Sequence, residues 1–535
     1  MRTLKLLVTF ILINITGAYS QQEVRIIPQP SLIEKRNGCY SLNGDVNIIA
    51  DDPVKNEASY LASVLEKGFG QKANINSRGL GIVLKLDSGL KKDLGEEGYK
   101  LSIEEEGVTI EAANNSGIFY GIQSFRQLLP PNFEFTNKEK SVIIPSINII
   151  DKPRFSWRSF HLDESRHFKG MEEVKKLLDQ MALLKMNKFH WHLTDDQGWR
   201  IEIKKYPRLT EVGSFRKDTQ KSRNSDERTG VPHSGFYTQE EIKEIIKYAE
   251  KKHIQIIPEI EMPGHATAAI AAYPWLGSLG TTKEVAVTFG KLEDSFNIAD
   301  PEVVEFLKDV LDEVITLFPG EVIHIGGDEV NFKPWKNSEI VKDFMEEKGL
   351  KSPVDLQIFF TNQMSEYIDN AGKRMMGWNE IMGEVLHEEL GAGGGKVEQE
   401  LSESAIVHFW KGDLELISEA AEQGYEVVNS NHWDTYLDYD YEKIPLSKSY
   451  DFNPIPEGLD QNYHSKILGF GVQMWSEYIP TVEKMDRQIF PRLAAYAEVG
   501  WTSLAEKDFE RFKRSLEILK ERWTLAGINF YEKTE

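Results

Sequence analysis

Residues 324–329 have the sequence His-Ile-Gly-Gly-Asp-Glu and follow the run Glu-Val-Ile at 321–323. Short β-branched residues that lead into two glycines and two adjacent carboxylates predict a buried strand that ends in a loop. The glycines permit a tight turn and a close approach of another molecule to the backbone. Because consecutive side chains of an extended backbone point in different directions, Asp328 and Glu329 are suited to two separate tasks. On this stretch alone, an acidic loop that caps the next helix is an open alternative.

Outward from this stretch, strand-like runs alternate with helical segments from Asp151 onwards. One helix is predicted to start with a capping box at Thr238 and Glu241, and another with Asp300 and Pro301. The strand candidates are 159–162, 188–193, 255–260, 322–325, 374–378, 405–410, 426–429 and 467–475. Eight strands separated mostly by helices predict an α/β fold, a closed (β/α)₈ TIM barrel over residues 150–535.

Residues 22–149 are predicted to form a small α+β domain that precedes the barrel. Its expected elements are strands at 45–49 and 81–86, a hairpin of 99–103 with 108–112, and helices at 56–67 and 117–129. The two prolines at 130–131 and the polar stretch 132–140 are expected to close it. Because catalytic side chains do not gather in this part of the chain, we expect its role to be structural.

The composition limits the class of protein. The chain has 535 residues, 40% of them hydrophobic and 28% charged, which is typical of a globular protein with two domains. The formal charge of −22 argues against a nucleic-acid partner, because phosphate binding needs clustered Lys and Arg. Cys39 is the single cysteine, which excludes an intrachain disulfide and a cysteine-based metal cluster.

Residues 1–20 have the pattern of a secretory signal peptide. Arg2 and Lys5 precede an apolar run at 6–15, and Ala-Tyr-Ser at 18–20 is a small-residue cleavage pattern. That run is short for a membrane span, and we expect no integral span elsewhere in the chain. The alternative is an anchor that stays in place. Export is the prediction, to a periplasm, the medium or a lysosome-like lumen.

Chemically active side chains follow nearly every predicted barrel strand. Barrel enzymes place their chemistry at the carboxyl ends of the strands, so these residues are predicted to converge on one site. This convergence favours a functional role for Asp328 and Glu329 over a helix cap. The residues are 163–166, 195–196, 261–265, 328–329, 378–380, Trp410, Tyr436 with Asp438, and 475–477.

Several carboxylates, one arginine and a ring of Trp and Tyr side chains are typical of a sugar site, because carboxylates accept hydrogen bonds from hydroxyls and aromatic faces stack on pyranose rings. Cleavage of a glycosidic bond needs a proton donor for the leaving oxygen and an anion near C1. Glu329 has the longer reach and suits the acid, provided that its surroundings raise its pKa. Asp328 would then stabilise charge beside it.

Two other chemistries compete with this interpretation. His190 and His192 share one face of their strand, and with His161 and His265 they leave a metal site as an alternative. For His190 and His161, a hydrogen-bonded position in a polar barrel core is favoured over metal ligation. The carboxylate- and Trp-rich rim argues against zinc or iron. We therefore expect no metal and no cofactor. The segment 391–396, Gly-Ala-Gly-Gly-Gly-Lys, lacks the upstream glycine and the following Ser or Thr of a phosphate loop, which favours a flexible insertion.

Four motifs, taken in their order along the chain, closely resemble the family 20 glycoside hydrolases, the β-N-acetylhexosaminidases. They are His-Ile-Gly-Gly-Asp-Glu at 324–329, Trp-His-Leu-Thr-Asp-Asp-Gln-Gly-Trp-Arg at 191–200, residues 258–265 ending in Pro-Gly-His, and Met-Trp-Ser-Glu at 474–477. The similarity runs from about Gln22 to the C-terminus. It implies a small α+β domain packed against a (β/α)₈ barrel.

The resemblance implies a mechanism that departs from the two-carboxylate scheme. The substrate's own 2-acetamido oxygen attacks C1 and forms an oxazolinium intermediate, with overall retention. By motif, Glu329 protonates the leaving oxygen and later activates water. Asp328 orients the acetamido group and stabilises its charge, and Tyr436 hydrogen-bonds the acetamido oxygen. An amide held within the substrate has a high effective concentration, so no carboxylate nucleophile is needed.

The resemblance also implies the remaining site residues. Asp195 and His265 resemble the pair that tunes Glu329 through hydrogen bonds, with Asp196 as the alternative to Asp195. Three groups are expected to hold the C3, C4 and C6 hydroxyls of the sugar: Arg166, Glu477 and, at the outer rim, Asp438. Three tryptophans resemble those that wall the acetamido and sugar-ring pocket, with ordinary barrel packing as the alternative: Trp378, Trp410 and Trp475.

The sequence therefore predicts an exported, exo-acting, retaining β-N-acetylhexosaminidase that hydrolyses terminal non-reducing β-linked GlcNAc or GalNAc. The expected partner is an oligosaccharide or glycoconjugate. A conventional two-carboxylate glycosidase is the alternative enzyme. An inactive sugar-binding module is the alternative from another class, although binding alone would not require Glu329. The linkage, the preference between the two sugars and the oligomeric state stay open.

Overall fold

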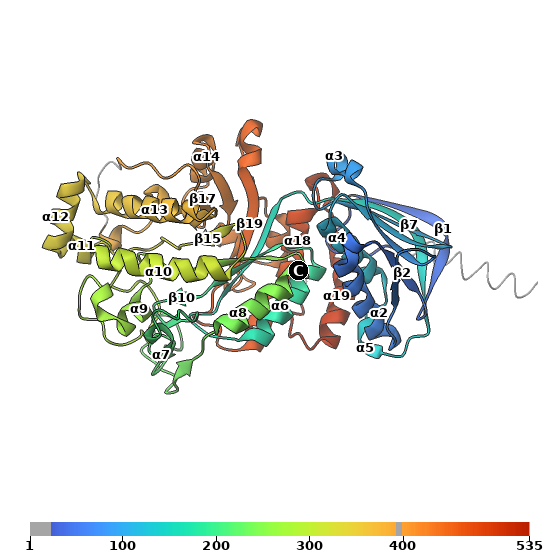
Figure 1. Cartoon of the computed structure of the whole chain (residues 1–535), viewed down its shortest axis with the longest axis horizontal. Coiled ribbons are helices and arrows are strands. Elements are labelled where there is room, and N and C mark those ends of the chain that lie inside the picture. The colour runs from blue at the N-terminus through green and yellow to red at the C-terminus, as the bar shows by residue number, and fades with distance from the viewer. Residues whose placement is uncertain (1–22, 392–397, 534–535) are drawn as a thin grey trace, which may run out of the picture.

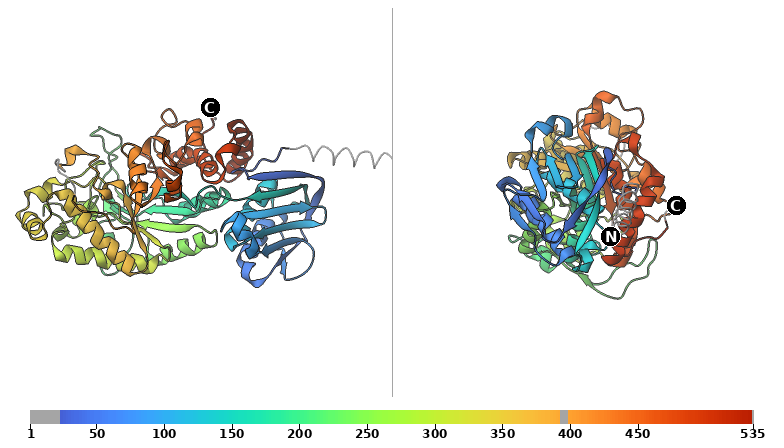
Figure 2. Two further views of the ribbon diagram at one scale, coloured as in Figure 1. Left: turned by 90° about the horizontal axis from the view of Figure 1, so that it is seen from above. Right: turned by 90° about the vertical axis from the view of Figure 1, so that its right-hand side faces the viewer.

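The computed structural model describes residues 23–391 and 398–533. Figure 1 shows an elongated molecule, with a sheet built from the N-terminal residues at one end and a barrel built from later residues at the other. The C-terminal helix α19 (Phe509–Leu525) lies at the junction between them (Figure 2). The predicted signal peptide and all but the first residue of the predicted insertion at 391–396 lie outside the described residues. None of the described helices is long and apolar enough to cross a membrane.

All eight predicted barrel strands are present, and they close into one parallel ring. The order around the ring is β14-β15-β16-β17-β18-β19-β8-β9, so the earliest strand, β8, closes the barrel against β19. The predicted (β/α)₈ barrel is therefore confirmed. The strands are β8 (Trp157–Asp163), β9 (Lys188–His192), β14 (Gln255–Glu259), β15 (Val322–His324), β16 (Arg374–Trp378), β17 (Ile406–Phe409), β18 (Glu426–Asn429) and β19 (Ile467–Met474).

Helices surround the ring, and their first turns have the predicted caps. The hydroxyl of Thr238 accepts a hydrogen bond from the Glu241 N–H, and the Glu241 carboxylate accepts one from the Thr238 N–H, at 3.2 and 2.8 Å. Asp300 accepts a hydrogen bond from the Glu302 N–H at 2.9 Å. The main outer helices are α6 (Met171–Leu183), α8 (Gln239–Glu250), α10 (Pro301–Leu317), α13 (Pro353–Asn370), α14 (Glu415–Glu422), α17 (Val482–Ile489) and α18 (Arg492–Trp501).

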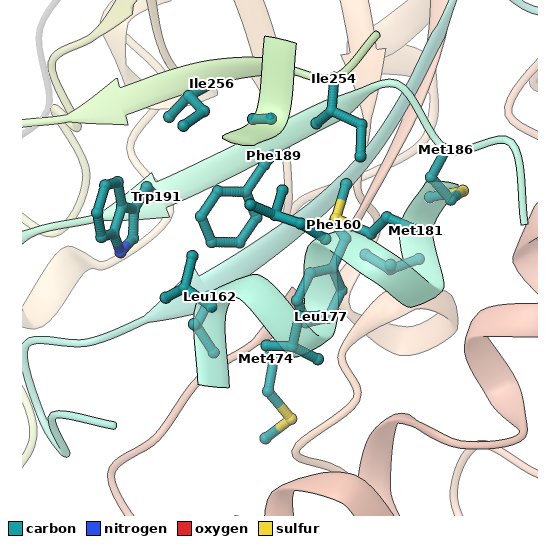
Figure 3. Packing of buried hydrophobic residues seen from close by; sticks show 14 of the residues in the cluster. Phe160, Leu162, Leu177, Met181, Met186, Phe189, Trp191, Ile254, Ile256 and Met474 are labelled. Carbon is teal, nitrogen blue, oxygen red and sulfur yellow. The ribbon is translucent and has the colours of Figure 1, made fainter. Parts of the chain in front are cut away.

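Alternation along the strands separates the outer core from the barrel interior. Phe160 and Leu162 on β8 and Phe189 and Trp191 on β9 are fully buried on the side that faces α6 (Figure 3). Because strand side chains alternate between faces, the residues between them point into the barrel. These inward residues are His161, Asp163, His190 and His192.

The barrel interior has an apolar layer and a polar layer. The apolar layer is Trp157, Ile257, Val322, Met376, Ile406 and Val428. All of these come from the amino-terminal half or the middle of their strands. Buried polar side chains take the places nearer the carboxyl ends, among them His161, His190, Glu259, His324, His408 and Gln473. The polar layer therefore lies next to the end of the barrel where the candidate site residues were predicted.

The N-terminal unit is a mixed sheet of seven strands in the order β1-β7-β5-β6-β4-β2-β3, with α2 (Lys55–Phe69) and α4 (Asn115–Leu128) packed against it. The predicted hairpin is present as an antiparallel pair. The seven strands of the N-terminal sheet are β1 (Leu32–Asn43), β2 (Asn47–Ala50), β3 (Asn74–Asn76), β4 (Ile82–Leu86), β5 (Tyr99–Glu104), β6 (Gly107–Ala112) and β7 (Ser141–Asp151).

Strands β1 and β7 were not predicted, although they form one long antiparallel pair. The sequence of β1 carries charged residues at 34–36 and a register shift between Lys35 and Cys39, which hides its alternation. The polar stretch 132–140 was predicted to end this unit. It contains the short helix α5 (Phe133–Thr136), after which β7 returns to the sheet beside β5.

A buried arginine joins the two units. Arg158 on β8 donates hydrogen bonds to both carboxylate oxygens of Glu97, at 2.8 and 2.9 Å. The same guanidinium donates to the backbone carbonyls of Lys185 and Phe155. A charge buried at this depth is tolerated because it is paired and fully hydrogen-bonded. The N-terminal sheet is thus attached to the first barrel strand, away from the carboxyl ends of the ring.

Candidate active site

The loop after β15 begins with the predicted glycine turn. Gly326 and Gly327 have φ angles of +68° and +95°, a region that glycine enters without strain. Glu329 and His265 also have positive φ, at +50° and +48°. This conformation is uncommon for residues that carry a Cβ, and such strain clusters at functional sites. Here the strained backbone angles occur at Glu329, the predicted acid, and at His265, its predicted partner.

His265 lies beside both predicted catalytic carboxylates. Its Nε2 is 3.7 Å from Asp328 Oδ2 and 3.9 Å from Glu329 Oε2. Asp328 is 9% exposed, and its Oδ1 is buried without a hydrogen-bond partner among the described atoms. The structure thus brings the three residues together on one side of the loop. Their chemical roles stay predictions.

Two neighbouring carboxylates approach the other ring nitrogen of His265. Asp195 Oδ1 and Asp196 Oδ2 each lie 3.2 Å from Nδ1. Asp196 also accepts hydrogen bonds from the backbone N–H and the hydroxyl of Thr267, at 3.0 and 2.5 Å. Asp195 instead pairs with Arg166 Nη2 at 2.7 Å. Asp195 and Asp196 therefore both contact His265. Only Asp195 also contacts Arg166, a residue predicted to bind the sugar.

A second histidine extends this chain of groups into the barrel interior. His192 has its Nε2 2.9 Å from Asp195 Oδ2 and its Nδ1 2.6 Å from Glu259 Oε2. Trp378 Nε1 donates a hydrogen bond to the other oxygen of Glu259 at 2.8 Å. Burial opposes ionisation of Glu259, but the charge of His192 holds its pKa well below the usual range. Sequence reasoning missed Glu259, although one acid in the apolar strand Gln-Ile-Ile-Pro-Glu is itself unusual.

The pKa values of the two adjacent acids are shifted in opposite directions. Burial raises the pKa of Asp328 to about 6, against the opposing charge of His265. Burial alone would lower the pKa of His265, but Asp195 and Asp196 raise it well above its usual value. Burial also raises the pKa of Glu329, yet a hydrogen bond from His387 and the charge of His265 outweigh it. The pKa of Glu329 is therefore lowered, so the condition set for its role as the acid, surroundings that raise this pKa, is not met in the structure.

Four aromatic side chains form a continuous wall at this end of the barrel. The ring centroids of Trp378 and Trp475 are 6.0 Å apart, and those of Trp475 and Tyr436 are 6.1 Å apart. Tyr436 and Trp410 are nearly parallel, with 6.3 Å between centroids and 13° between planes. The structure thus groups the three predicted tryptophans with the predicted tyrosine.

The tryptophans of this wall are held in different ways. Trp378 is 1% exposed and stacks on His408 with 4.1 Å between centroids, so it also packs in the barrel interior as the alternative proposed. Trp410 and Trp475 are half-buried. Trp410 Nε1 donates a hydrogen bond to Glu380 at 2.9 Å. Burial raises the pKa of Glu380 to about 8, so this carboxyl adds little negative charge at neutral pH.

Of the residues predicted to bind the sugar hydroxyls, Arg166 lies against the aromatic wall, and Glu477 is close enough to Arg166 and Asp438 for its charge to raise the pKa of each. The guanidinium of Arg166 is 5.2 Å from the centre of the Trp475 ring, and its Nε donates a hydrogen bond to Gln197 at 2.9 Å. Burial and the charge of Glu477 raise the pKa of Asp438 well above its usual value. Asp438 Oδ1 is buried and has no hydrogen-bond partner among the described atoms. A hydroxyl donor is the natural partner for such an oxygen.

Sequence reasoning also missed a set of basic residues beside Glu329. His387 Nε2 is 3.0 Å from Glu329 Oε1, and Lys291 Nζ is 3.9 Å from the same oxygen. Lys411 Nζ lies 3.1 Å from His387 Nε2. These residues come from three separate loops, and none of them belongs to a motif that would have marked it.

The metal alternative is tested by the positions of the donor atoms. Three groups of described residues place donor atoms within 4.8 Å of one another: His161, His190 and Glu259; His192, Glu259 and Glu261; and Asp195, Asp196 and His265. Each group uses Glu259 or Asp195, so a cation there would compete with the hydrogen-bonded chain that leads to His265. The expectation of a metal-free site stays a prediction, and metal analysis of active protein after chelation would test it.

Replacement of Asp195 by asparagine is expected to lower kcat/KM about 10-fold or more and to change its pH dependence. Without this carboxylate the pKa of His265 falls, so His265 loses its charge at a lower pH. Glu329 then loses a neighbouring cation, its pKa rises, and the alkaline limb of kcat/KM moves to higher pH. The measurement is the full pH profile of kcat/KM.

Asp196→Asn is the matched comparison, because Asp196 contacts Nδ1 of His265, as Asp195 does, but does not pair with Arg166. We expect its alkaline limb to move less than that of Asp195→Asn. Equal shifts in the two variants, or none in either, would contradict the assignment of Asp195 as the positioning partner of His265.

Acids next to an aromatic wall, at the carboxyl end of a closed (β/α)₈ barrel, define the class of this protein as a glycoside hydrolase. Comparisons with known proteins agree. Residues 155–504 match the model of the glycosyl hydrolase family 20 catalytic domain, and residues 23–152 match that of glycosyl hydrolase family 20, domain 2. The chain therefore belongs to glycosyl hydrolase family 20.

Individual relatives support this placement. A beta-hexosaminidase from Porphyromonas gingivalis is 38% identical over 95% of this chain, which spans 64% of that protein. The N-acetyl-beta-hexosaminidase structure from Streptomyces plicatus in complex with Thio-NAglucal has a TM-score of 0.81 at 32% identity, covering 95% of this chain and 97% of that one. A GH20 exo beta-N-acetylglucosaminidase from Vibrio harveyi, in complex with N-acetylglucosamine, has a TM-score of 0.81 at 32% identity over 95% of this chain and 78% of that one.

Proposed function

We propose that this chain is an exo-acting, retaining β-N-acetylhexosaminidase that removes terminal non-reducing β-linked GlcNAc or GalNAc by substrate-assisted catalysis. Family membership supports the reaction class. The exo activity printed for the Vibrio harveyi protein supports the mode of attack. The substrates are oligosaccharides or glycoconjugates that end in such a sugar.

One observation carries the mechanistic part of the proposal. Asp328 and Glu329 both lie within 4 Å of one nitrogen, Nε2 of His265. In a conventional retaining glycosidase, the acid and the carboxylate nucleophile flank the glycosidic bond at about 5–5.5 Å from each other. Two consecutive residues that share one imidazole are poorly placed to act from opposite sides of C1. A nucleophile supplied by the substrate removes that requirement.

In the proposed first step, the acetamido carbonyl oxygen forms a bond to C1 while the bond from C1 to the leaving oxygen breaks. Glu329 gives its proton to that oxygen, and the positive charge spreads over the new oxazolinium ring. Asp328 accepts a hydrogen bond from the amide N–H and offsets this charge, and Tyr436 hydrogen-bonds the acetamido oxygen. In the second step Glu329 takes a proton from water, whose oxygen attacks C1 and restores the amide.

The proposal gives the aromatic wall and the rim separate tasks. Trp378, Trp410 and Trp475 enclose the acetamido group and the sugar ring and exclude water from the intermediate. Three polar residues fix the hydroxyls at the far edge of the sugar and so select a terminal residue: Arg166, Asp438 and Glu477.

The lowered pKa of Glu329 fits its second task better than its first, because an ionised carboxylate is the form that accepts a proton from water. For the first step, the bound sugar has to exclude water and weaken the contact with His387. Desolvation raises the pKa of a carboxyl, so closure of the site over a sugar moves Glu329 towards the acid form.

Proton NMR of nitrophenyl β-GlcNAc hydrolysis tests the proposed function. We expect GlcNAc to be released as the β-anomer first, with the α-anomer appearing only through slow mutarotation. Initial release of the α-anomer would contradict retention. No release of sugar by purified, folded protein would favour the sugar-binding alternative instead.

We further propose that the protein is exported, on the basis of the charged and apolar pattern of residues 1–20. The N-terminal residue of the native protein tests this. A start at Gln21 would support cleavage, and an intact Met1 would contradict it.

A further inference from the structure

Two basic side chains approach one oxygen of Glu329, and a third contacts one of those two. His265 approaches Oε2, whereas His387 and Lys291 approach Oε1, at 3.0 and 3.9 Å. Lys411 reaches the same group through His387, with Nζ 3.1 Å from its Nε2. Lys291 also contacts His387 Nδ1. One imidazole is therefore bracketed by two ammonium groups.

Two carboxylates pair with this group, and neither of them contacts Lys411: Glu329 contacts His387 and Lys291, and Glu389 contacts the same two side chains. Lys291 pairs with Glu389, whose side chain is 65% exposed. Lys411 makes no ion pair with any Asp or Glu side chain that the structure describes, and it is half-buried. Glu380 is close to this group, but burial raises its pKa to about 8. Like charges repel strongly where water is partly excluded, so an anion bound here would relieve an unfavourable arrangement.

The position of this group relative to Glu329 indicates which part of a substrate it meets. In the proposed function, Glu329 stands at the leaving oxygen, and the released sugar lies among Asp328, Tyr436 and the tryptophans. The next sugar is joined through that oxygen and has to extend past Glu329 on the opposite side. Trp410 lies next to both regions, because its ring centroid is 6.3 Å from that of Tyr436 and 6.1 Å from that of His387.

We propose that Lys291, His387 and Lys411 form a leaving-group subsite that binds an acidic sugar, one that carries a carboxylate or a sulfate next to the scissile bond. This inference rests on the proposed function and names its substrate class. Ammonium and imidazole groups make charge-assisted hydrogen bonds to either anion. Lysine binds as a point charge without the planar fork of arginine, so the subsite does not require one anion geometry.

The test compares three β-GlcNAc disaccharides that differ only in the leaving sugar: glucose, glucuronic acid, and glucose carrying a 6-sulfate. We expect kcat/KM for at least one acidic disaccharide to exceed that for the neutral one by about 10-fold or more at low salt. The preference should shrink as NaCl is raised, because salt screens partly exposed charges. The carboxylate and sulfate arms identify which anion the subsite takes.

Lys411→Met and Lys291→Met keep the aliphatic stem and remove the charge, and each is expected to reduce the acidic-to-neutral ratio by about 3-fold or more. Lys342→Met is the matched control, because Lys342 is 51% exposed on α12 (Glu339–Lys348) and pairs only with Glu339 among the described residues. It should leave the ratio unchanged.

A wild-type ratio near one on both acidic arms would overturn the subsite, and so would a ratio that survives both lysine replacements. Hydrolysis of the neutral disaccharide keeps this test separate from the proposed function. If the neutral substrate is cleaved and the ratio is one, only the subsite is wrong. If no disaccharide is cleaved, the proposed function fails as well.

Discussion

Replacement of Glu329 by glutamine is expected to slow the hydrolysis of a GlcNAc disaccharide by roughly 10² to 10⁴-fold, because the amide neither donates the proton that the leaving oxygen needs nor accepts one from water. The loss should be smaller for a nitrophenyl glycoside, whose leaving group departs without full protonation. The measurement is kcat/KM for both substrates in both proteins.

Added azide separates the two tasks of Glu329. Azide is already anionic and needs no base, so it should restore turnover of the nitrophenyl substrate by the variant and give the β-glycosyl azide. A disaccharide should not be rescued, since its first step still lacks an acid. Glu339→Gln is the control, because that side chain is 81% exposed and pairs only with Lys342 among the described residues. Near wild-type cleavage of the disaccharide by Glu329→Gln would refute its role.

The barrel was predictable because each of its strands carries its own local signal. Runs such as Gln255–Glu259 and Ile467–Met474 are short and mostly apolar, as buried parallel strands are, and helices with caps such as Thr238 separate the strands. Strand β1 was missed for the opposite reason. Its charged residues are exposed on an edge strand, and its pairing with β7 joins segments about a hundred residues apart, which local periodicity does not report.

The candidate site was predictable where residues follow strands and much less so elsewhere. Asp328 and Glu329 follow an apolar strand and its glycine turn, and the family motifs mark their neighbours. His387, Lys291 and Lys411 come from loops, and only the fold brings them to Glu329. The direction of the Glu329 pKa shift could not be predicted for the same reason, since it depends on side chains that are distant in sequence.

Glu259 illustrates a third kind of limit. Its strand was predicted correctly, but its contacts with His192 and Trp378 depend on which residues of neighbouring strands share a layer of the barrel. Register between parallel strands is set by the closed ring and not by any one segment. The hydrogen bond from Trp378 to Glu259 could therefore not be predicted from the sequence of either strand alone.

A substrate whose 2-acetamido group is replaced by hydroxyl is expected to be cleaved at least ~10³-fold more slowly than the matching GlcNAc glycoside, because well-placed intramolecular groups have effective molarities of roughly 10⁵ to 10⁸ M. Asp328 and Glu329 share His265, so these two acids are poorly placed to replace the missing nucleophile on the far side of C1. The measurement is kcat/KM for the two nitrophenyl glycosides.

A graded series makes the same argument quantitative. Mono-, di- and trifluoroacetamido substrates bind through the same ring and hydroxyls, while each fluorine withdraws electrons from the carbonyl oxygen. If that oxygen attacks C1, kcat should fall steadily along the series. A conventional two-carboxylate enzyme would be nearly indifferent to the fluorines, would cleave the plain β-glucoside, and would accumulate a covalent glycosyl-protein with a slow substrate. Detection of that adduct by mass spectrometry would replace substrate assistance with a protein nucleophile.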